Sequence, residues 1–150
     1  MSLRNALLGL SLLVFTAPAR AALGGDAASI ASDTTALEAS REITRTAGVE
    51  IHVLHLRTGT TVHEYAAHGK VFAIAWGGPV IPDLRRLLGS YFDAYVNNPQ
   101  GRNTGHHSMR VVQTHDWVVQ SAGHPNAFVG RAWLSNEIPA GFDLATVRAW

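Results

Sequence analysis

The sequence predicts an α+β domain in which an antiparallel meander sheet carries one main amphipathic helix, in the order β-β-β-α-β-β-β. Three runs rich in β-branched and aromatic residues lie between residues 49 and 76, separated by short turns that contain glycine. An apolar stripe with helical spacing follows these runs. Three further β-rich runs come after the stripe. Because short turns join neighbouring strands, we expect antiparallel pairing before and after the helix.

The first 21 residues have the pattern of a cleaved export signal. Arg4 supplies the positive start, an apolar run extends over residues 6–15, and Ala19-Arg20-Ala21 provides small residues at a cleavage site. This apolar run is too short for a bilayer core, which needs about 20 apolar residues. We therefore expect a periplasmic or secreted protein whose mature chain begins near residue 22 and has no transmembrane segment.

The composition of the remaining chain excludes several partners and chemistries. Removing 21 of the 150 residues leaves 129, which is enough for one domain. The removal takes away two arginines, so 10 basic residues face 11 acidic ones, and no surplus of positive charge is present for binding nucleic acid. The chain has no cysteine, which excludes disulfides, a thiol nucleophile and thiolate metal ligands.

Two segments precede the sheet. Residues 22–33 are mostly small, so we expect a flexible leader there, followed by a single α+β domain over residues 34–150. Residues 34–46 place two glutamates three residues before two arginines, a spacing that favours a short exposed helix. These four residues are Glu38, Glu42, Arg41 and Arg45.

The first meander is expected to collect its bulky side chains on one face. Two-residue turns at Thr58-Gly59 and His68-Gly69 would place Leu54 opposite His63 and Tyr65 opposite Phe72, and alternation along each strand then assigns every residue to a face. The bulky face receives Leu54, Leu56, Tyr65, Phe72, Ile74 and Trp76. The opposite face takes smaller apolar residues, with Glu64 as a charged exception.

Residues 82–96 predict the main helix. Pro82-Asp83 suits a first helical turn. Pro99 stops the helix because proline disfavours helical geometry in the residue before it. The large apolar residues recur at helical spacing and form one stripe: Leu84, Leu87, Leu88, Tyr91, Phe92 and Tyr95. We expect this stripe to pack on the bulky face of the meander.

The second half of the chain predicts another meander. Its strands are expected at residues 109–114, 117–121 and 127–134, separated by polar turns. Residues 137–150 contain Pro139 and Gly141 and receive no assignment. The aromatic residues of the strands are expected to fill the core, with a binding platform as the alternative. These residues are Tyr65, Trp76, Trp117 and Trp133.

Three segments together resemble one bacterial family. They are Ala22-Leu23-Gly24-Gly25, Val71-Phe72-Ala73-Ile74-Ala75-Trp76-Gly77-Gly78-Pro79 and Pro82-Asp83-Leu84-Arg85-Arg86-Leu87-Leu88-Gly89-Ser90-Tyr91-Phe92. On these segments, nearly the whole mature chain resembles the domain of unknown function 2844 (DUF2844) family. The resemblance implies a small exported proteobacterial protein with one domain. It gives no information about an activity, a cofactor or catalytic residues.

Eight histidines in a chain without cysteine raise a metal-binding hypothesis. His106, His107 and His115 lie in a polar loop and in the next turn, and three imidazoles would suit a zinc-like ion with one open position. His52 and His63 form a second pair, which the expected register places diagonally on the bulky face. We interpret this second pair as hydrogen-bonded histidines at the rim of the core.

The remaining patterns favour no enzymatic activity. No Gly-x-Ser-x-Gly elbow occurs, and Glu64 is a single carboxylate where glycoside hydrolysis needs two. We therefore expect an exported binding or accessory protein that meets a protein partner or a second copy through the smaller-residue sheet face or an exposed edge strand. The alternative is a metal-binding protein or metal-dependent hydrolase that uses His106, His107 and His115.

Overall fold

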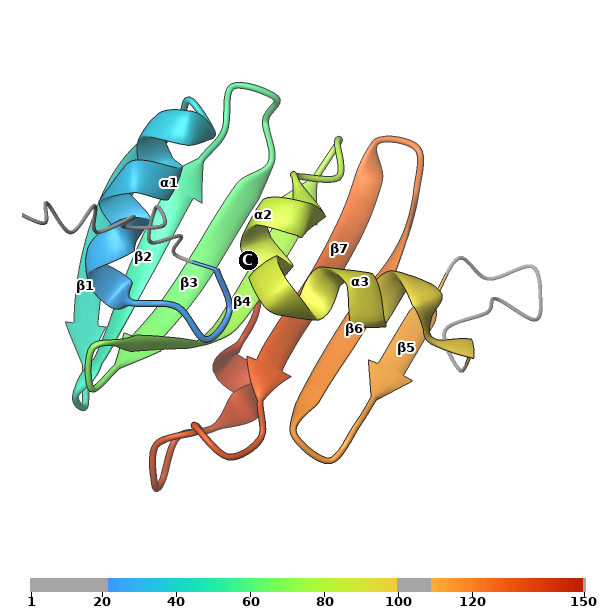
Figure 1. Cartoon of the computed structure of the whole chain (residues 1–150). Helices are drawn as coiled ribbons and strands as arrows, with labels where there is room; N and C mark the ends of the chain where they lie inside the picture. The colour runs from blue at the N-terminus through green and yellow to red at the C-terminus, as the bar shows by residue number, and fades with distance from the viewer. Residues whose placement is uncertain (1–21, 100–108, 150) are drawn as a thin grey trace, which may run out of the picture.

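In the computed structural model, residues 22–99 and 109–149 are described, and they form a seven-stranded antiparallel sheet with helices across one face (Figure 1). The strand order is β1-β2-β3-β4-β7-β6-β5. The strands are β1 Ser40–Thr46, β2 Val49–His55, β3 Thr61–Ala67, β4 Lys70–Gly78, β5 Arg110–Gln113, β6 Trp117–His124 and β7 Ala127–Leu134. The predicted α+β fold is confirmed, and pairing of β4 with β7 joins the two meanders into one sheet.

Two helical units cover what we call the helix face of the sheet. The first consists of η1 Ala27–Ser29 and α1 Ile30–Ala36, and the second of α2 Leu84–Leu88, η2 Gly89–Tyr91 and α3 Phe92–Asn97. The side chain of Asp83 caps α2 by accepting a hydrogen bond from the amide of Arg86 at 3.0 Å. The predicted helix over residues 82–96 is interrupted at Gly89, which has a φ of 53° and would meet Ala22 if it carried a Cβ atom. The apolar stripe nevertheless packs on the sheet as predicted.

Residues 22–33 differ from the expected flexible leader, because they pack against the sheet and α2. The amide of Leu23 donates to the carbonyl of Leu87 at 2.9 Å, and the amide of Gly24 donates to the carbonyl of Val71 at 2.8 Å. The large side chains of this segment that are almost completely buried are Leu23 and Ile30. Backbone pairing and these two anchors order a segment whose composition alone indicated too little apolar bulk.

Residues 40–46 form strand β1, where the prediction of a helix over residues 34–46 is wrong. The helix α1 ends at Ala36, and β1 pairs with β2 along its whole length. The β-branched residues of β1 favour an extended backbone. Arg45 finds its acidic partner across the ladder, where its Nε donates to Glu50 Oε1 at 2.7 Å. The spacing of charges was therefore also compatible with a strand.

The register of the first meander differs from the expected one by one residue, and this divides the bulky residues between the two faces. Leu54 lies opposite Val62, and Tyr65 lies opposite Ala73. A bulge follows Tyr65 and leaves Phe72 as an extra residue on β4, so that Phe72 and Ala73 share a face. Packing of Leu54, Leu56, Ile74 and Trp76 under the helices is confirmed.

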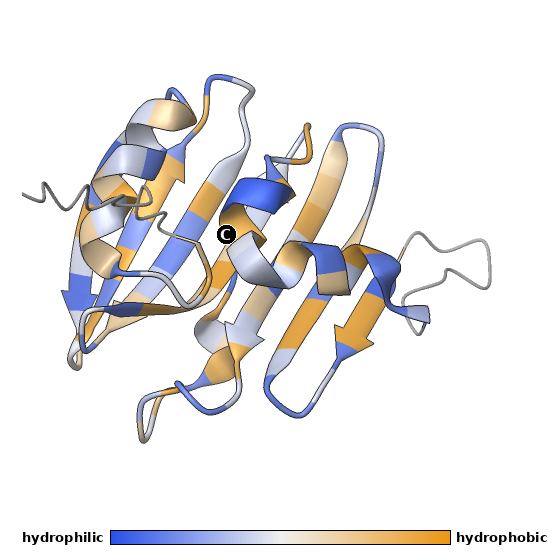
Figure 2. Cartoon of the chain, viewed as in Figure 1, coloured by the Kyte–Doolittle hydropathy of each residue, from blue (hydrophilic) through white to orange (hydrophobic). Residues whose placement is uncertain are grey.

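Two residues of the predicted bulky face, Tyr65 and Phe72, belong instead to the opposite face, which we call the far face. The shift also moves Glu64 onto the helix face, between Val62 and Ala66 at the two-residue spacing of a strand. Figure 2 shows the resulting alternation of hydrophobic and hydrophilic residues along the strands. A single bulge and a one-residue slip thus exchange the faces of several side chains, including Tyr65, Phe72 and Glu64.

The C-terminal segment, which received no assignment from the sequence, covers part of the far face behind the sheet (Figure 1). The hydroxyl of Tyr65 lies 2.9 Å from the carbonyl oxygen of Thr146 and accepts a hydrogen bond from the amide of Arg148 at 3.2 Å. The rings of Phe142 and Phe72 meet edge to face, with centroids 5.0 Å apart. The short helix η4 Leu144–Thr146 lies within this layer. Strands β2, β3 and β4 therefore have packed layers on both faces, whereas the edge strand β1 is exposed.

Candidate functional site

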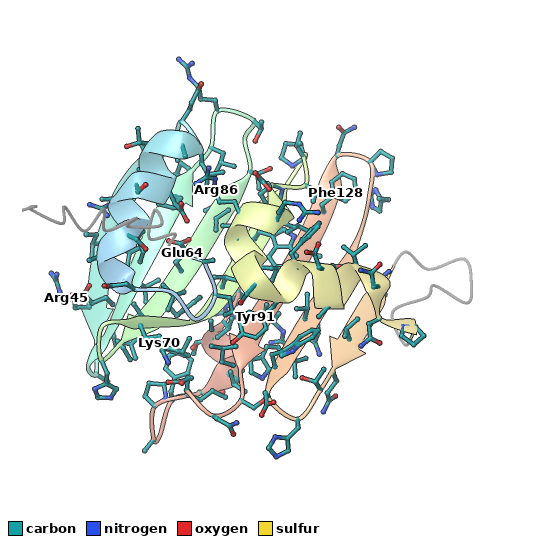
Figure 3. All side chains as sticks on the ribbon, viewed as in Figure 1. Arg45, Glu64, Lys70, Arg86, Tyr91 and Phe128 are labelled. Atoms are coloured by element: carbon teal, nitrogen blue, oxygen red, sulfur yellow. The ribbon has the colours of Figure 1, made fainter. Side chains whose placement is uncertain are left out.

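A group of buried ionisable side chains lies on the helix face beside α1. Asp33 and Glu64 are completely buried, and His52 is 4% exposed. Arg86 Nη1 donates to Asp33 Oδ1 at 2.9 Å. The other oxygen of Asp33, both oxygens of Glu64 and Nδ1 of His52 have no hydrogen-bond partner among the described residues. Figure 3 shows Glu64 on β3 between α1 and α2, with Arg86 above it.

Burial suppresses the charges of Glu64 and His52. Desolvation, with the nearby Asp33 carboxylate, raises the pKa of Glu64 to about 8, so Glu64 holds its proton at neutral pH. Burial also lowers the pKa of His52, although the Glu50 carboxylate 3.3 Å from its Nε2 opposes that shift. A substrate cannot reach groups that are at most 4% exposed. The cluster is therefore part of the interior and is not an active site.

The histidine pair His52 and His63 does not come together. His52 lies opposite Glu64 on the helix face, whereas His63 lies opposite Val53 on the far face, with its ring centroid 6.3 Å from that of Tyr65. The expected diagonal contact depended on the register that the structure corrects. Burial lowers the pKa of His63 as well, because desolvation disfavours its charged form.

The predicted metal ligands are only partly within the described chain. His106 and His107 lie outside the described residues. His115 occupies the exposed turn between β5 and β6, with Nδ1 2.8 Å from Asp116 Oδ1. Among residues 22–99 and 109–149, no three histidine, aspartate or glutamate side chains are close enough to share a metal ion. The site formed by His106, His107 and His115 stays a prediction.

An open groove lies on the far face over β6 and β7, beside the end of the C-terminal segment. It encloses about 380 Å³. Its apolar lining consists of Met109, Ala122, Val129, Val147 and Ala149. Met109 is 57% exposed and Val129 is 37% exposed, so the described residues leave apolar surface exposed at the groove. An exposed apolar concavity of this size is typical of a ligand site.

Arg131 supplies the groove with a fixed positive charge. Its Nε donates to Gln120 Oε1 at 2.8 Å, and its Nη1 lies 3.5 Å from the carbonyl oxygen of Leu144. Its guanidinium carbon lies 5.3 Å from the centre of the Trp133 ring. Arg148, which is exposed, adds a second cation to the lining. The described lining residues include no aspartate or glutamate.

Neither Arg131 nor this groove was predicted from the sequence. Residues two apart in a strand share a face. Alternation would therefore have placed Gln120 on the groove side of β6, and its partner Arg131 on the groove side of β7. The groove itself needs the pairing of β4 with β7 and the path of residues 137–149. Neither feature has a signal in local sequence periodicity.

Comparison with known proteins gives one family and no characterised relative. The family model described as "Protein of unknown function (DUF2844)" matches residues 19–147 of the chain. No curated protein and no solved structure gives a match. Within the described residues, none of the helices has the length and apolar character needed to cross a membrane. The chain belongs to the DUF2844 family, whose function is unknown.

Proposed function

We propose that this chain is an exported, non-catalytic binding protein that holds its ligand in the groove on the far face. The observation that carries the proposal is the uncovered apolar surface around Met109 and Val129, beside a concavity of about 380 Å³. Strands β2, β3 and β4 are covered on both faces by helices and by the C-terminal segment. Exposed apolar surface in the second half therefore needs a reason, and ligand binding supplies one.

The groove chemistry supports binding rather than catalysis. Ser121 is the hydroxyl residue among the described lining residues, and its Oγ is hydrogen-bonded to the hydroxyl of Tyr95 at 2.9 Å. No histidine or carboxylate stands beside it in that lining to act as a base. The titratable groups with the strongest burial, Asp33 and Glu64, are enclosed on the other face.

A neutral fluorescent probe tests groove binding. N-phenyl-1-naphthylamine should bind the protein expressed from its full sequence, and Val129→Glu should weaken that binding about tenfold or more, since a carboxylate on the lining opposes apolar contact. Val80→Glu is the matched control, because Val80 is 45% exposed and does not line the groove. Equal binding by the protein and by both variants would contradict the proposal.

The export part of the proposal rests on residues 1–21, which lie outside the described residues. The charged start, short apolar run and small-residue site support cleavage after Ala21. Protein recovered from the periplasm or the medium should therefore begin at Ala22 on N-terminal sequencing. Recovery of the protein in the cytoplasmic fraction with its first residues intact would contradict export.

Pairing at the edge strand β1 is the second candidate for partner binding. All seven of its side chains are exposed, and its outer backbone edge faces no strand of the described chain. Such an edge accepts a strand from a protein partner or a second copy. However, Arg41, Glu42 and Arg45 place charges on the strand, a device that discourages pairing, so we rank this candidate second. Sedimentation over a concentration series tests self-association, and Thr44→Pro is the variant that should prevent strand pairing. A monomer at every concentration would contradict pairing with a second copy.

A further inference from the structure

We propose that the ligand of the far-face groove is a small apolar carboxylate, a molecule with a hydrocarbon body and one carboxylate head. This inference rests on the proposed binding function and names its ligand class. The juxtaposition that carries it is Arg131 in the same lining as the exposed apolar side chains of Met109 and Val129, with Arg148 also in the lining.

The charge of Arg131 has no acidic partner within the described chain. Its hydrogen bonds go to neutral oxygens of Gln120 and Leu144, and no described ion pair includes Arg131 or Arg148. These bonds use Nε and Nη1 and leave Nη2 without a described partner. A guanidinium with free donors in one plane matches the two oxygens of a carboxylate. An anionic ligand would therefore complete the electrostatics of the groove.

The guanidinium is also held in place before any ligand arrives. Gln120 fixes its Nε at 2.8 Å, and the Trp133 ring lies 5.3 Å from its central carbon. Arg131 itself is half-buried on β7, which is paired on both sides, with β4 and with β6. A side chain that is already ordered loses less conformational entropy on binding, so this arrangement favours a specific head group over general attraction of anions.

The rest of the groove selects the body of the ligand. Its apolar side chains, Met109, Ala122, Val129, Val147 and Ala149, suit hydrocarbon, whereas sugars or free phosphate would leave them in contact with polar groups. A volume of about 380 Å³ lies near the lower end of the range for small-molecule sites. A neutral apolar molecule would cover Arg131 without a counter-ion, and a cationic one would be repelled. An apolar carboxylate satisfies both parts of the groove.

Three probes that share one hydrocarbon chain separate the alternatives. Decanoate, decanol and decyltrimethylammonium are titrated below their aggregation concentrations against the protein expressed from its full sequence, with displacement of N-phenyl-1-naphthylamine as the readout. Decanoate should bind about tenfold more tightly than decanol, and the cation should bind most weakly. Arg131→Gln should bring decanoate to the affinity of decanol.

Two further variants keep the test decisive. Arg131→Lys retains the charge but loses the planar fork, so it should keep only part of the preference and also serves if the Gln variant misfolds. Arg57→Gln is the matched control, since this exposed arginine lies outside the groove lining and should leave the preference unchanged. Equal binding of decanoate and decanol by the unaltered protein, or a preference that survives Arg131→Gln in a folded variant, would overturn the inference while leaving groove binding intact. Failure of all probes would overturn both proposals.

Discussion

Replacing Glu64 by glutamine tests how strongly burial couples this carboxyl to folding. The pKa of Glu64 rises from 4.5 to about 8 in the folded protein, mainly through desolvation. A shift of about 3.5 units corresponds to about 5 kcal/mol, at 1.36 kcal/mol per unit. Between these two pH values the native state holds a proton that the unfolded state has released. The Glu64 contribution is therefore fully present below about pH 4.5 and is lost as pH rises toward about 8.

The assay is urea unfolding at several pH values between 5 and 9. The unaltered protein should lose up to about 1.4 kcal/mol per pH unit through Glu64, and Glu64→Gln should remove that slope because glutamine does not titrate. His52 opposes this trend below its ordinary value of 6.5, because a lowered pKa makes the protein more stable as pH rises there, so the proteins are compared with each other at each pH. Asp33 and Arg41 act on the Glu64 carboxyl itself, so their influence is part of the measured difference, and Arg86 pairs with Asp33 beside the site.

A matched variant completes that experiment. Glu42→Gln removes a carboxylate from the fully exposed strand β1 and should leave the pH dependence as it is in the unaltered protein. If Glu64→Gln and the unaltered protein show the same slope between pH 5 and 8, Glu64 is ionised inside the fold or is not buried. Either result would refute the description of this site as a protonated interior carboxyl.

The remaining predictions concern the packing of the two faces. Leu88→Ala should lower the free energy of unfolding by about 2 to 5 kcal/mol in urea titration, because Leu88, the last residue of α2, is completely buried. A loss below about 0.5 kcal/mol would contradict its place in the core. Gly130→Ala should destabilise the fold by about 1 to 3 kcal/mol, since a methyl group there would overlap the buried ring of Trp76, and an unchanged melting temperature would argue against that contact. Tyr65→Phe should accelerate hydrogen exchange at the amide of Arg148, whose hydrogen bond to the Tyr65 hydroxyl is lost, whereas unchanged exchange would show that this bond does not hold the C-terminal segment.

The main helical region could be predicted because its signals are local. The spacing of Leu84, Leu87 and Leu88 and the capping carboxylate of Asp83 lie within a few residues of one another. The interruption at Gly89 could not be predicted in the same way, because it depends on close approach by Ala22, a residue far away in the sequence. Local periodicity therefore identifies the buried stripe but not the break in the helix axis.

The assignment of faces in the first meander shows a second limit. Alternation specifies faces only when the register is known, and the bulge after Tyr65 leaves no mark in residue type. One displaced pairing moved Phe72 to the far face and Glu64 into the interior of the helix face. The strands of the first meander were thus predicted correctly, whereas Glu64, whose pKa shift is the strongest, was assigned to the wrong face.

The candidate site was harder to predict because its parts come from distant segments. Arg131 lies on β7, Gln120 on β6, and Leu144 in the C-terminal segment that received no assignment. The histidines were easier to notice because they are adjacent in sequence, yet His115 is exposed on a turn in the described structure. Spacing along the chain is informative for helices and turns, but a groove between strands and a terminal segment requires the three-dimensional pairing.

A nitrogen-15 NMR titration with decanoate tests far-face binding most directly. We expect chemical-shift changes at the amides of Val129 and Arg148 and at the Nε–H of Arg131, with the helix-face amides of Leu54 and Leu88 unaffected. Changes confined to the helix face, or no saturable change at the far face, would contradict the account.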